Sequence, residues 1–162
     1  MAKIITFSRT FPSYHDRSGQ QTFFVEKFIR AWDNAHTFDE IAASPIIDTS
    51  VCDLKILQHC MPKSHTIRKG KRFKKGDYFS PRIWSGRPYW TKLITICPDT
   101  LITDVFDFEV TKNGYLLKGK KVSLIKLREI AANDGLSSDD LELWFPKPFK
   151  GQIICWNKDV TY

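Results

Sequence analysis

A succession of short β-like segments in the middle of the chain constrains the fold more than any other feature. Each is rich in β-branched and aromatic residues and is bounded by turn-forming residues, as strands usually are. They cover residues 65–68, 78–84, 91–97 and 101–110, with further short strands expected at 3–7 and 151–157. Asn113-Gly114 predicts a hairpin turn, and Pro81 predicts an edge strand or a bulge. Many short strands with few helices predict an α+β protein, built on a small curved β-barrel with flanking helices.

Three stretches have helical periodicity. The first, within residues 22–32, has an apolar stripe that should belong to the core rather than to a cofactor pocket. That stripe consists of Phe24, Val25, Phe28, Ile29 and Trp32. The second ends at Asp134-Gly135, where a glycine suits the left-handed position after a helix. The third is predicted to be capped by one of the serines at 137–138 and to end at Trp144.

The length of 162 residues predicts a single domain, 1–162. Within it, residues 33–60 are ambiguous: 38–44 is compatible with a helical turn, and 54–60 with either a strand or a helix. No apolar run approaches the roughly 20 residues that span a bilayer, and no signal peptide is evident. We therefore expect a cytoplasmic protein without membrane contact; the oligomeric state stays open.

The four cysteines lack metal-site spacing. They stand at positions 52, 60, 97 and 155, and no two of them form a C-x-x-C pair. Free thiols are the expectation for a chain of this kind. The sequence predicts neither a metal nor a cofactor.

The net charge of +7 comes entirely from one segment. Residues 61–92 contain ten basic residues and one acidic residue, which gives +9, whereas the rest has 15 basic and 17 acidic residues, which gives −2. Such a concentrated field favours a polyanionic partner, of which nucleic acid is the commonest. The plain alternative is a solvated, lysine-rich turn.

An arginine- and aromatic-rich stretch, RIWSGRPYW, ends this basic segment. Arginines bind phosphates and aromatic rings stack on bases, so the stretch is a candidate for ligand binding; core packing is the competing interpretation. The ligand-binding candidates here are Arg82, Trp84, Arg87 and Tyr89, with Arg68 from the strand at 65–68 and Arg9 from the loop before the first helix.

Three residues could carry catalysis. Asp134 stands at a helix C-terminus, whose negative dipole end predicts a raised pKa and a general acid/base role; an ordinary surface aspartate is the alternative. Lys63 and Thr66 could form a base–nucleophile pair. In a regular strand they would point to opposite faces, so Lys63 must lie in a loop, with Thr66 and Arg68 on one face of the strand. His65 has no evident partner.

The motif around these residues resembles the signature of the ASCH domain family, small barrels related to PUA domains. The resemblance rests on Lys63, Thr66-Ile67-Arg68 and Gly76-Asp77, on EIAANDGLSSDDLELWF, and on GQIICWN. It covers roughly residues 60–157, leaving 1–59 as an N-terminal extension, and the opening FSRTFPSYHDRSGQQTFFVEKF looks like the start of small bacterial and phage members.

This resemblance implies an RNA- or nucleotide-binding protein with a basic ligand cleft. One branch hydrolyses acetylcytidine, and by that likeness Thr66 would be the nucleophile, Lys63 its activator and Asp134 a proton shuttle in place of a glutamate. Because another member is reported as a ribonuclease, the resemblance also leaves ribonuclease activity open. A protein-interaction domain that uses the basic face is a further alternative.

Overall fold

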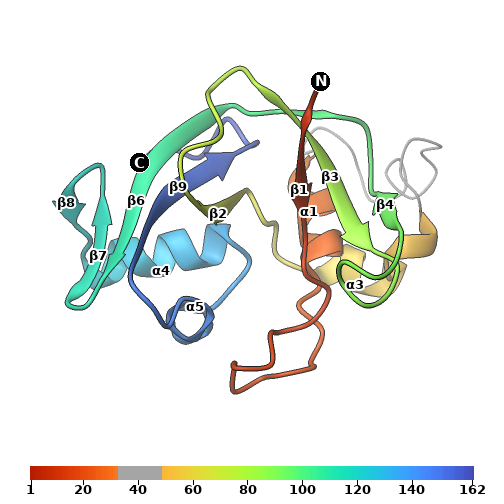
Figure 1. Cartoon of the computed structure of the whole chain (residues 1–162), viewed down its shortest axis with the longest axis horizontal. Coiled ribbons are helices and arrows are strands. Elements are labelled where there is room, and N and C mark those ends of the chain that lie inside the picture. The colour runs from red at the N-terminus through yellow and green to blue at the C-terminus, as the bar shows by residue number, and fades with distance from the viewer. Residues whose placement is uncertain (33–48) are drawn as a thin grey trace.

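The computed structural model describes residues 1–32 and 49–162 (Figure 1). These residues form four α-helices and nine strands, and the strands belong to two separate sheets. The helical turn expected at 38–44 lies outside the described residues. The nine strands and four α-helices confirm the predicted α+β class. Hydrogen bonding among the described strands does not close them into a barrel.

The first sheet is built around β3 (Tyr78–Trp84), which pairs in parallel with β1 (Lys3–Thr6) and antiparallel with β4 (Leu93–Thr95) and β5 (Thr100–Leu101). Pro81 predicted an edge strand or a bulge, and the first alternative is wrong because β3 is central. Pro81 is tolerated because its missing N–H falls between the residues that pair with β5 and those that pair with β4. Its carbonyl still accepts a hydrogen bond from the Ile96 N–H (3.0 Å).

The second sheet is antiparallel, with strand order β2-β9-β6-β7-β8. These strands are β2 (His65–Lys69), β9 (Phe149–Cys155), β6 (Asp104–Thr111), β7 (Gly114–Leu117) and β8 (Lys120–Lys121). The predicted hairpin joins β6 to β7, but its two loop residues are Lys112 and Asn113, one position earlier than expected. Gly114, with φ of +121°, is the first residue of β7 and adopts a backbone conformation that other residues rarely reach.

Local capping accounts for the helix ends. In α3 (Leu54–His59) the Asp53 carboxylate accepts hydrogen bonds from two backbone N–H groups, which explains why the ambiguous stretch 54–60 is helical. Ser123 caps α4 (Leu124–Asn133) and Ser137 caps α5 (Ser138–Trp144). α1 is Phe24–Trp32, and a short 3₁₀ helix covers Thr49–Val51. No helix within the described residues is long and apolar enough to cross a membrane.

A cluster of aromatic rings joins the two sheets into one core. Phe28 of α1, fully buried, lies 5.1 Å from the ring of Trp156, which follows β9, and 6.2 Å from that of Phe79 in β3. Phe7, which follows β1, completes the cluster at 5.0 Å from Phe28. The N-terminal strand and helix are thus integral to the core, and β2 and β1 face each other across a gap that contains the candidate site.

Candidate functional site

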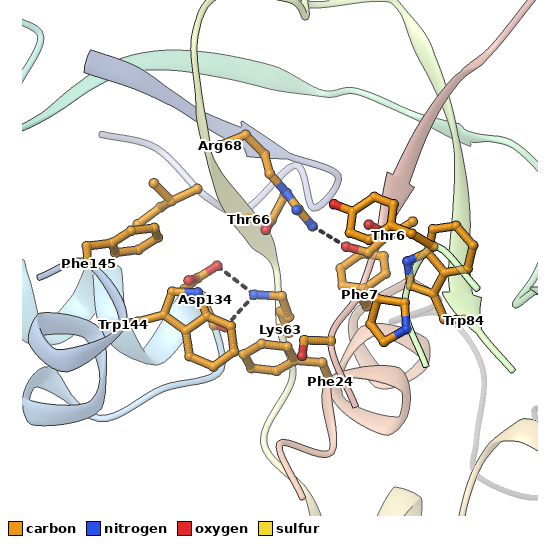
Figure 2. Close-up of a pocket in the computed structure, with 14 residues that line it drawn as sticks. Thr6, Phe7, Phe24, Lys63, Thr66, Arg68, Trp84, Asp134, Trp144 and Phe145 are labelled. Carbon is orange, nitrogen blue, oxygen red and sulfur yellow. Dashed lines mark hydrogen bonds and ion pairs between the residues drawn. The ribbon is translucent and has the colours of Figure 1, made fainter. Parts of the chain in front are cut away.

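A cavity of about 300 Å³ lies between β2, the β1 end, the loop after β3 and the C-terminal ends of α4 and α5 (Figure 2). Polar groups occupy its floor and aromatic rings its walls. The residues used below are Lys63, Thr66, Arg68 and Asp134, with the rings of Phe7, Phe24, Trp84, Tyr89, Trp144 and Phe145.

Lys63 is held in the loop before β2, as predicted, by backbone hydrogen bonds on both of its sides. Its own N–H donates to the Lys27 carbonyl (2.8 Å) in α1, and the Ser64 N–H donates to the Asn133 carbonyl (2.7 Å) at the end of α4. The side chain is only 1% exposed. The Lys63 loop is therefore fixed against two helices, which aims its ammonium group into the cavity.

The Lys63 ammonium group contacts Asp134 twice. Nζ lies 2.5 Å from both the carboxylate Oδ1 and the backbone carbonyl oxygen of Asp134, and 4.3 Å from the centre of the Phe24 ring. Asp134 is the C-cap of α4, and the chain turns there through Gly135 with φ of +78°, as predicted. A Cβ on Gly135 would lie 3.2 Å from Lys27 Cδ, so a glycine is favoured by space as well as by conformation.

Burial and pairing act in opposite directions on this pair. Burial lowers the pKa of Lys63 from 10.5 to about 8, although Asp134 and its hydrogen bond raise it. Burial alone would raise the pKa of Asp134, but Lys63 and His65 outweigh it and leave that pKa below its ordinary value. The raised pKa predicted for Asp134 is therefore wrong, because Lys63 and His65 lower the pKa by more than burial raises it. At pH 7 roughly one Lys63 side chain in ten is neutral.

Thr66 and Arg68 project from β2 toward the same cavity, as the strand geometry predicted (Figure 2). The Arg68 guanidinium donates through Nη2 to the Thr6 carbonyl of β1. Its Nε is buried and has no hydrogen-bond partner among the described residues. Arg68 thus holds a buried, unsatisfied donor next to the cavity that the residue lines.

The aromatic walls come from several elements. Phe24, Trp144 and Phe145 lie on one side, and Phe7 and Trp84 on the other (Figure 2). The Tyr89 ring lies 5.2 Å from that of Trp84. The helical stripe was predicted to be core only; most of it is buried, but Phe24 lines the cavity as well. Trp144 and Phe145 also line the cavity, although the sequence did not identify them as ligand-binding residues. Two adjacent aromatic residues at the end of a capped helix were the sequence feature that could have indicated this role.

Three predicted ligand-binding arginines do not line the cavity. Arg9 is exposed and lines a different hollow. The Arg82 Nε donates to the Ser80 hydroxyl (3.1 Å). Arg87 is exposed, with its guanidinium 5.3 Å from the Trp90 ring centre. The predicted set thus separates: Arg68, Trp84 and Tyr89 line the cavity, and the other three lie outside it.

Acidic residues of β6 partly neutralise the basic segment. Lys71 pairs with Asp107 (2.7 Å) and Lys75 with Asp104 (3.0 Å). Lys63 is already paired inside the protein. The positive field is therefore weaker than the +9 of the segment predicts, because residues distant in sequence supply counter-charges.

His65 has partners that the sequence did not reveal, so the expectation of none is wrong. It is fully buried, its Nε2 lies 2.8 Å from the Tyr162 hydroxyl, and its Nδ1 lies 3.7 Å from Asp134 Oδ1. His65 therefore stands directly behind the Lys63–Asp134 pair.

Comparison with protein-family models, curated proteins and solved structures finds no match. Function must therefore be argued from the site. Within residues 1–32 and 49–162 no group of three or more histidine, cysteine, aspartate or glutamate side chains could hold a metal ion. The cavity combines a lysine whose pKa burial lowers, a hydroxyl group, an arginine and aromatic walls. This combination suits nucleophilic chemistry on a small planar molecule.

Proposed function

We propose that the protein is an amidohydrolase that removes an acyl group from a cytidine-type nucleoside or nucleotide. The observation that carries the proposal is the buried Lys63–Asp134 pair, 2.5 Å apart, in a cavity that Thr66 also lines. Strongly perturbed titratable groups with a specific charge partner inside a cavity are typical of catalytic sites.

The chemistry needs side chains of the cavity and one water molecule. Neutral Lys63 accepts the hydroxyl proton of Thr66 as its Oγ1 attacks the amide carbonyl, which forms a tetrahedral intermediate. When the C–N bond breaks, Lys63 returns the proton to the leaving amine. Water then hydrolyses the acyl-threonine ester, giving a carboxylic acid and free Thr66. The Arg68 guanidinium, which lines the cavity, supplies positive charge beside the developing oxyanion.

Size and lining support a ligand no larger than one nucleoside. A volume of about 300 Å³ is at the lower end of the range for ligand pockets. A cavity of this size accommodates a base but not a folded nucleic acid. Trp84 and Trp144 line the cavity, and aromatic rings of this kind suit stacking on a planar base.

The resemblance to ASCH domains, with their PUA-like curved barrel, fits this proposal. By that likeness a glutamate would stand where this chain has Asp134. The shorter side chain still reaches Lys63, because Asp134 Oδ1 lies 2.5 Å from Nζ. One methylene less therefore does not remove the contact between the carboxylate and Lys63.

Turnover of a panel of N-acylated cytidines, adenosines and guanosines tests the proposal. We expect release of the free nucleoside by the wild type, with Thr66→Val and Lys63→Met reducing kcat/KM at least about 100-fold and Thr66→Ser retaining part of it. Lys71→Met, an exposed lysine outside the cavity, is the matched control. Activity that survives in both Thr66→Val and Lys63→Met, or no turnover of any compound, would contradict the proposal.

A second candidate, RNA or nucleotide binding without chemistry, is favoured by the exposed loop between β3 and β4. Tyr89 and Trp90 are 88% and 78% exposed there, and Arg87 lies over the Trp90 ring. Exposed rings beside an arginine suit stacking on single-stranded bases. Single-stranded RNA should then bind more weakly as salt rises and in Trp90→Ala; affinity indifferent to both excludes this candidate.

A further inference from the structure

A row of buried, interacting side chains extends from the Lys63–Asp134 pair away from the cavity. His65, in β2, lies between Asp134 on one side and Tyr162 on the other. The Tyr162 hydroxyl also accepts a hydrogen bond from Asn133 Nδ2 (2.9 Å), and its ring stands edge-on to the imidazole at 5.7 Å. His65 does not line the cavity, so it cannot touch a ligand there.

The hydrogen bonds around Tyr162 select one tautomer of His65. Because Asn133 donates to the Tyr162 oxygen, the single hydroxyl proton is free to be donated to His65 Nε2. The imidazole proton then resides on Nδ1. The opposite tautomer would point the Nδ1 lone pair at the Asp134 carboxylate, 3.7 Å away, which is electrostatically unfavourable.

Burial keeps both His65 and Tyr162 uncharged. It lowers the pKa of His65, which favours neutral imidazole, and it raises the pKa of Tyr162, which keeps the hydroxyl proton in place. His65 Nδ1 has no hydrogen-bond partner within normal distance among the described residues. Its proton therefore lies near the Asp134 carboxylate, whose Oδ1 is 3.7 Å from Nδ1, and near the backbone of Ile130, which also raises the pKa of His65.

We propose that His65, oriented by Tyr162, is a positioning residue that stabilises the Asp134 carboxylate when Lys63 gives up its proton. The inference rests on the proposed function for its use in catalysis, but its physical content concerns only His65, Tyr162, Asp134 and Lys63.

The direction of the effect follows from the charge balance. While Lys63 is protonated, its ammonium group compensates the Asp134 charge at 2.5 Å. Once Lys63 is neutral, the anion depends on other donors, of which His65 Nδ1–H is one. Removing that donor makes the deprotonation of Lys63 harder and moves its titration to higher pH.

Other charged groups face the pair and must stay unchanged in the test. Asp134 raises the pKa of Lys63, whereas Arg68 in β2 and Lys27 in α1 lower it. On the far side, Tyr162 faces Cys155 and Glu129.

The first experiment reads the tautomer in the wild type. In ¹⁵N-labelled protein, long-range ¹H–¹⁵N spectra distinguish protonated from unprotonated ring nitrogens, and the His65→Asn spectrum identifies the His65 signals. We expect neutral His65 with its proton on Nδ1 at pH 7. A proton on Nε2, or a doubly protonated ring, would overturn the inference.

The second experiment follows the titration of Lys63 through its ¹³Cε chemical shift. We expect the midpoint to move up by about one pH unit in His65→Leu and by less in Tyr162→Phe. His65→Asn, whose amide can donate from the Nδ1 position, should restore it in part. Tyr115→Phe, which loses the hydroxyl of another buried tyrosine outside the cavity, should match the wild type.

The two proposals can fail separately. If Lys63 titrates at the same pH in the wild type and in folded Tyr162→Phe and His65→Leu, the positioning role is wrong even where acylated nucleosides are hydrolysed. If the midpoint moves as expected but no acylated nucleoside is turned over, the positioning role stands and the amidohydrolase proposal falls. If His65→Leu does not fold, the positioning role is tested by the Lys63 titration in Tyr162→Phe and by the His65 tautomer in the wild type.

Discussion

Two lysine–aspartate pairs of nearly equal length lie in opposite surroundings in this protein. Lys63 and Asp134 are 2.5 Å apart with side chains 1% and 6% exposed, whereas Lys71 and Asp107 are 2.7 Å apart with side chains 63% and 56% exposed. Both lysines belong to the basic segment, and nothing in their identity distinguishes them. Their surroundings separate a group with a strongly shifted pKa from an ordinary surface charge.

The difference is one of hydration. Water screens the Lys71–Asp107 pair, so its two charges interact weakly and gain little by meeting. Lys63 and Asp134 have lost their hydration shells, and each depends on the other for compensation. A lysine in that position is costly for folding, and its proton is available near neutral pH.

The largest effect should come from removing one half of the buried pair. Asp134→Ala leaves an uncompensated ammonium group inside the protein and should lower the free energy of unfolding by about 3–5 kcal/mol. Urea unfolding at pH 7 measures it, with Asp107→Ala as the matched control. A loss in Asp134→Ala as small as in the control would show that the pair is hydrated.

The pH dependence of stability should isolate Lys63. Its pKa is about 8 in the folded protein and the ordinary 10.5 when unfolded, so between these values the unfolded state binds more protons. Stability therefore gains on the order of 3 kcal/mol from Lys63 as pH rises through this window. Cys97 and Cys155, whose pKa values burial raises to about 12, act in the opposite direction.

The difference between wild type and Lys63→Met cancels the cysteine contribution. Urea unfolding at intervals from pH 7.5 to 10.5 should show wild-type stability increasing relative to the variant. Parallel curves would mean that Lys63 has the same pKa in both states.

Replacing both charged residues should restore most of the free energy of unfolding that is lost when only one is replaced. Lys63→Met with Asp134→Leu removes the desolvation penalty together with the attraction, and apolar groups of similar size can pack in their place. We expect unfolding free energy within about 2 kcal/mol of wild type. A double variant as unstable as Asp134→Ala would indicate that the cavity, not the charge, carries the cost.

The surface pair should give the smallest effect. Lys71→Met should change the free energy of unfolding by no more than about 0.5 kcal/mol, and less at 1 M salt. Thermal unfolding at low and high salt measures it. A loss of several kcal/mol would erase the contrast between the two pairs.

Local features of the fold could be predicted because they depend on neighbouring residues. The apolar stripe of α1, the Gly135 turn after α4 and the serine cap of α5 all follow from short-range spacing. The hairpin after β6 was also predicted, though one residue late.

Features that depend on residues distant in sequence could not be read from spacing. Pro81 lies in a central strand because β1 pairs with β3 across more than seventy residues. Residue position and spacing suggested separate roles for Lys63 and Asp134. The likeness to ASCH domains assigned the two residues to one site. Neither could show the contact that lowers the pKa of Asp134, nor that Tyr162 lies beside His65.

The titration of Lys63 in the wild-type protein tests the central claim most directly, because it needs neither a substrate nor a variant other than Lys63→Met for assignment. The ¹³Cε shift of Lys63 should titrate with a midpoint near 8. A midpoint near the ordinary 10.5 would show that burial does not lower the pKa of Lys63 on balance, and the proposed chemistry would lose its base.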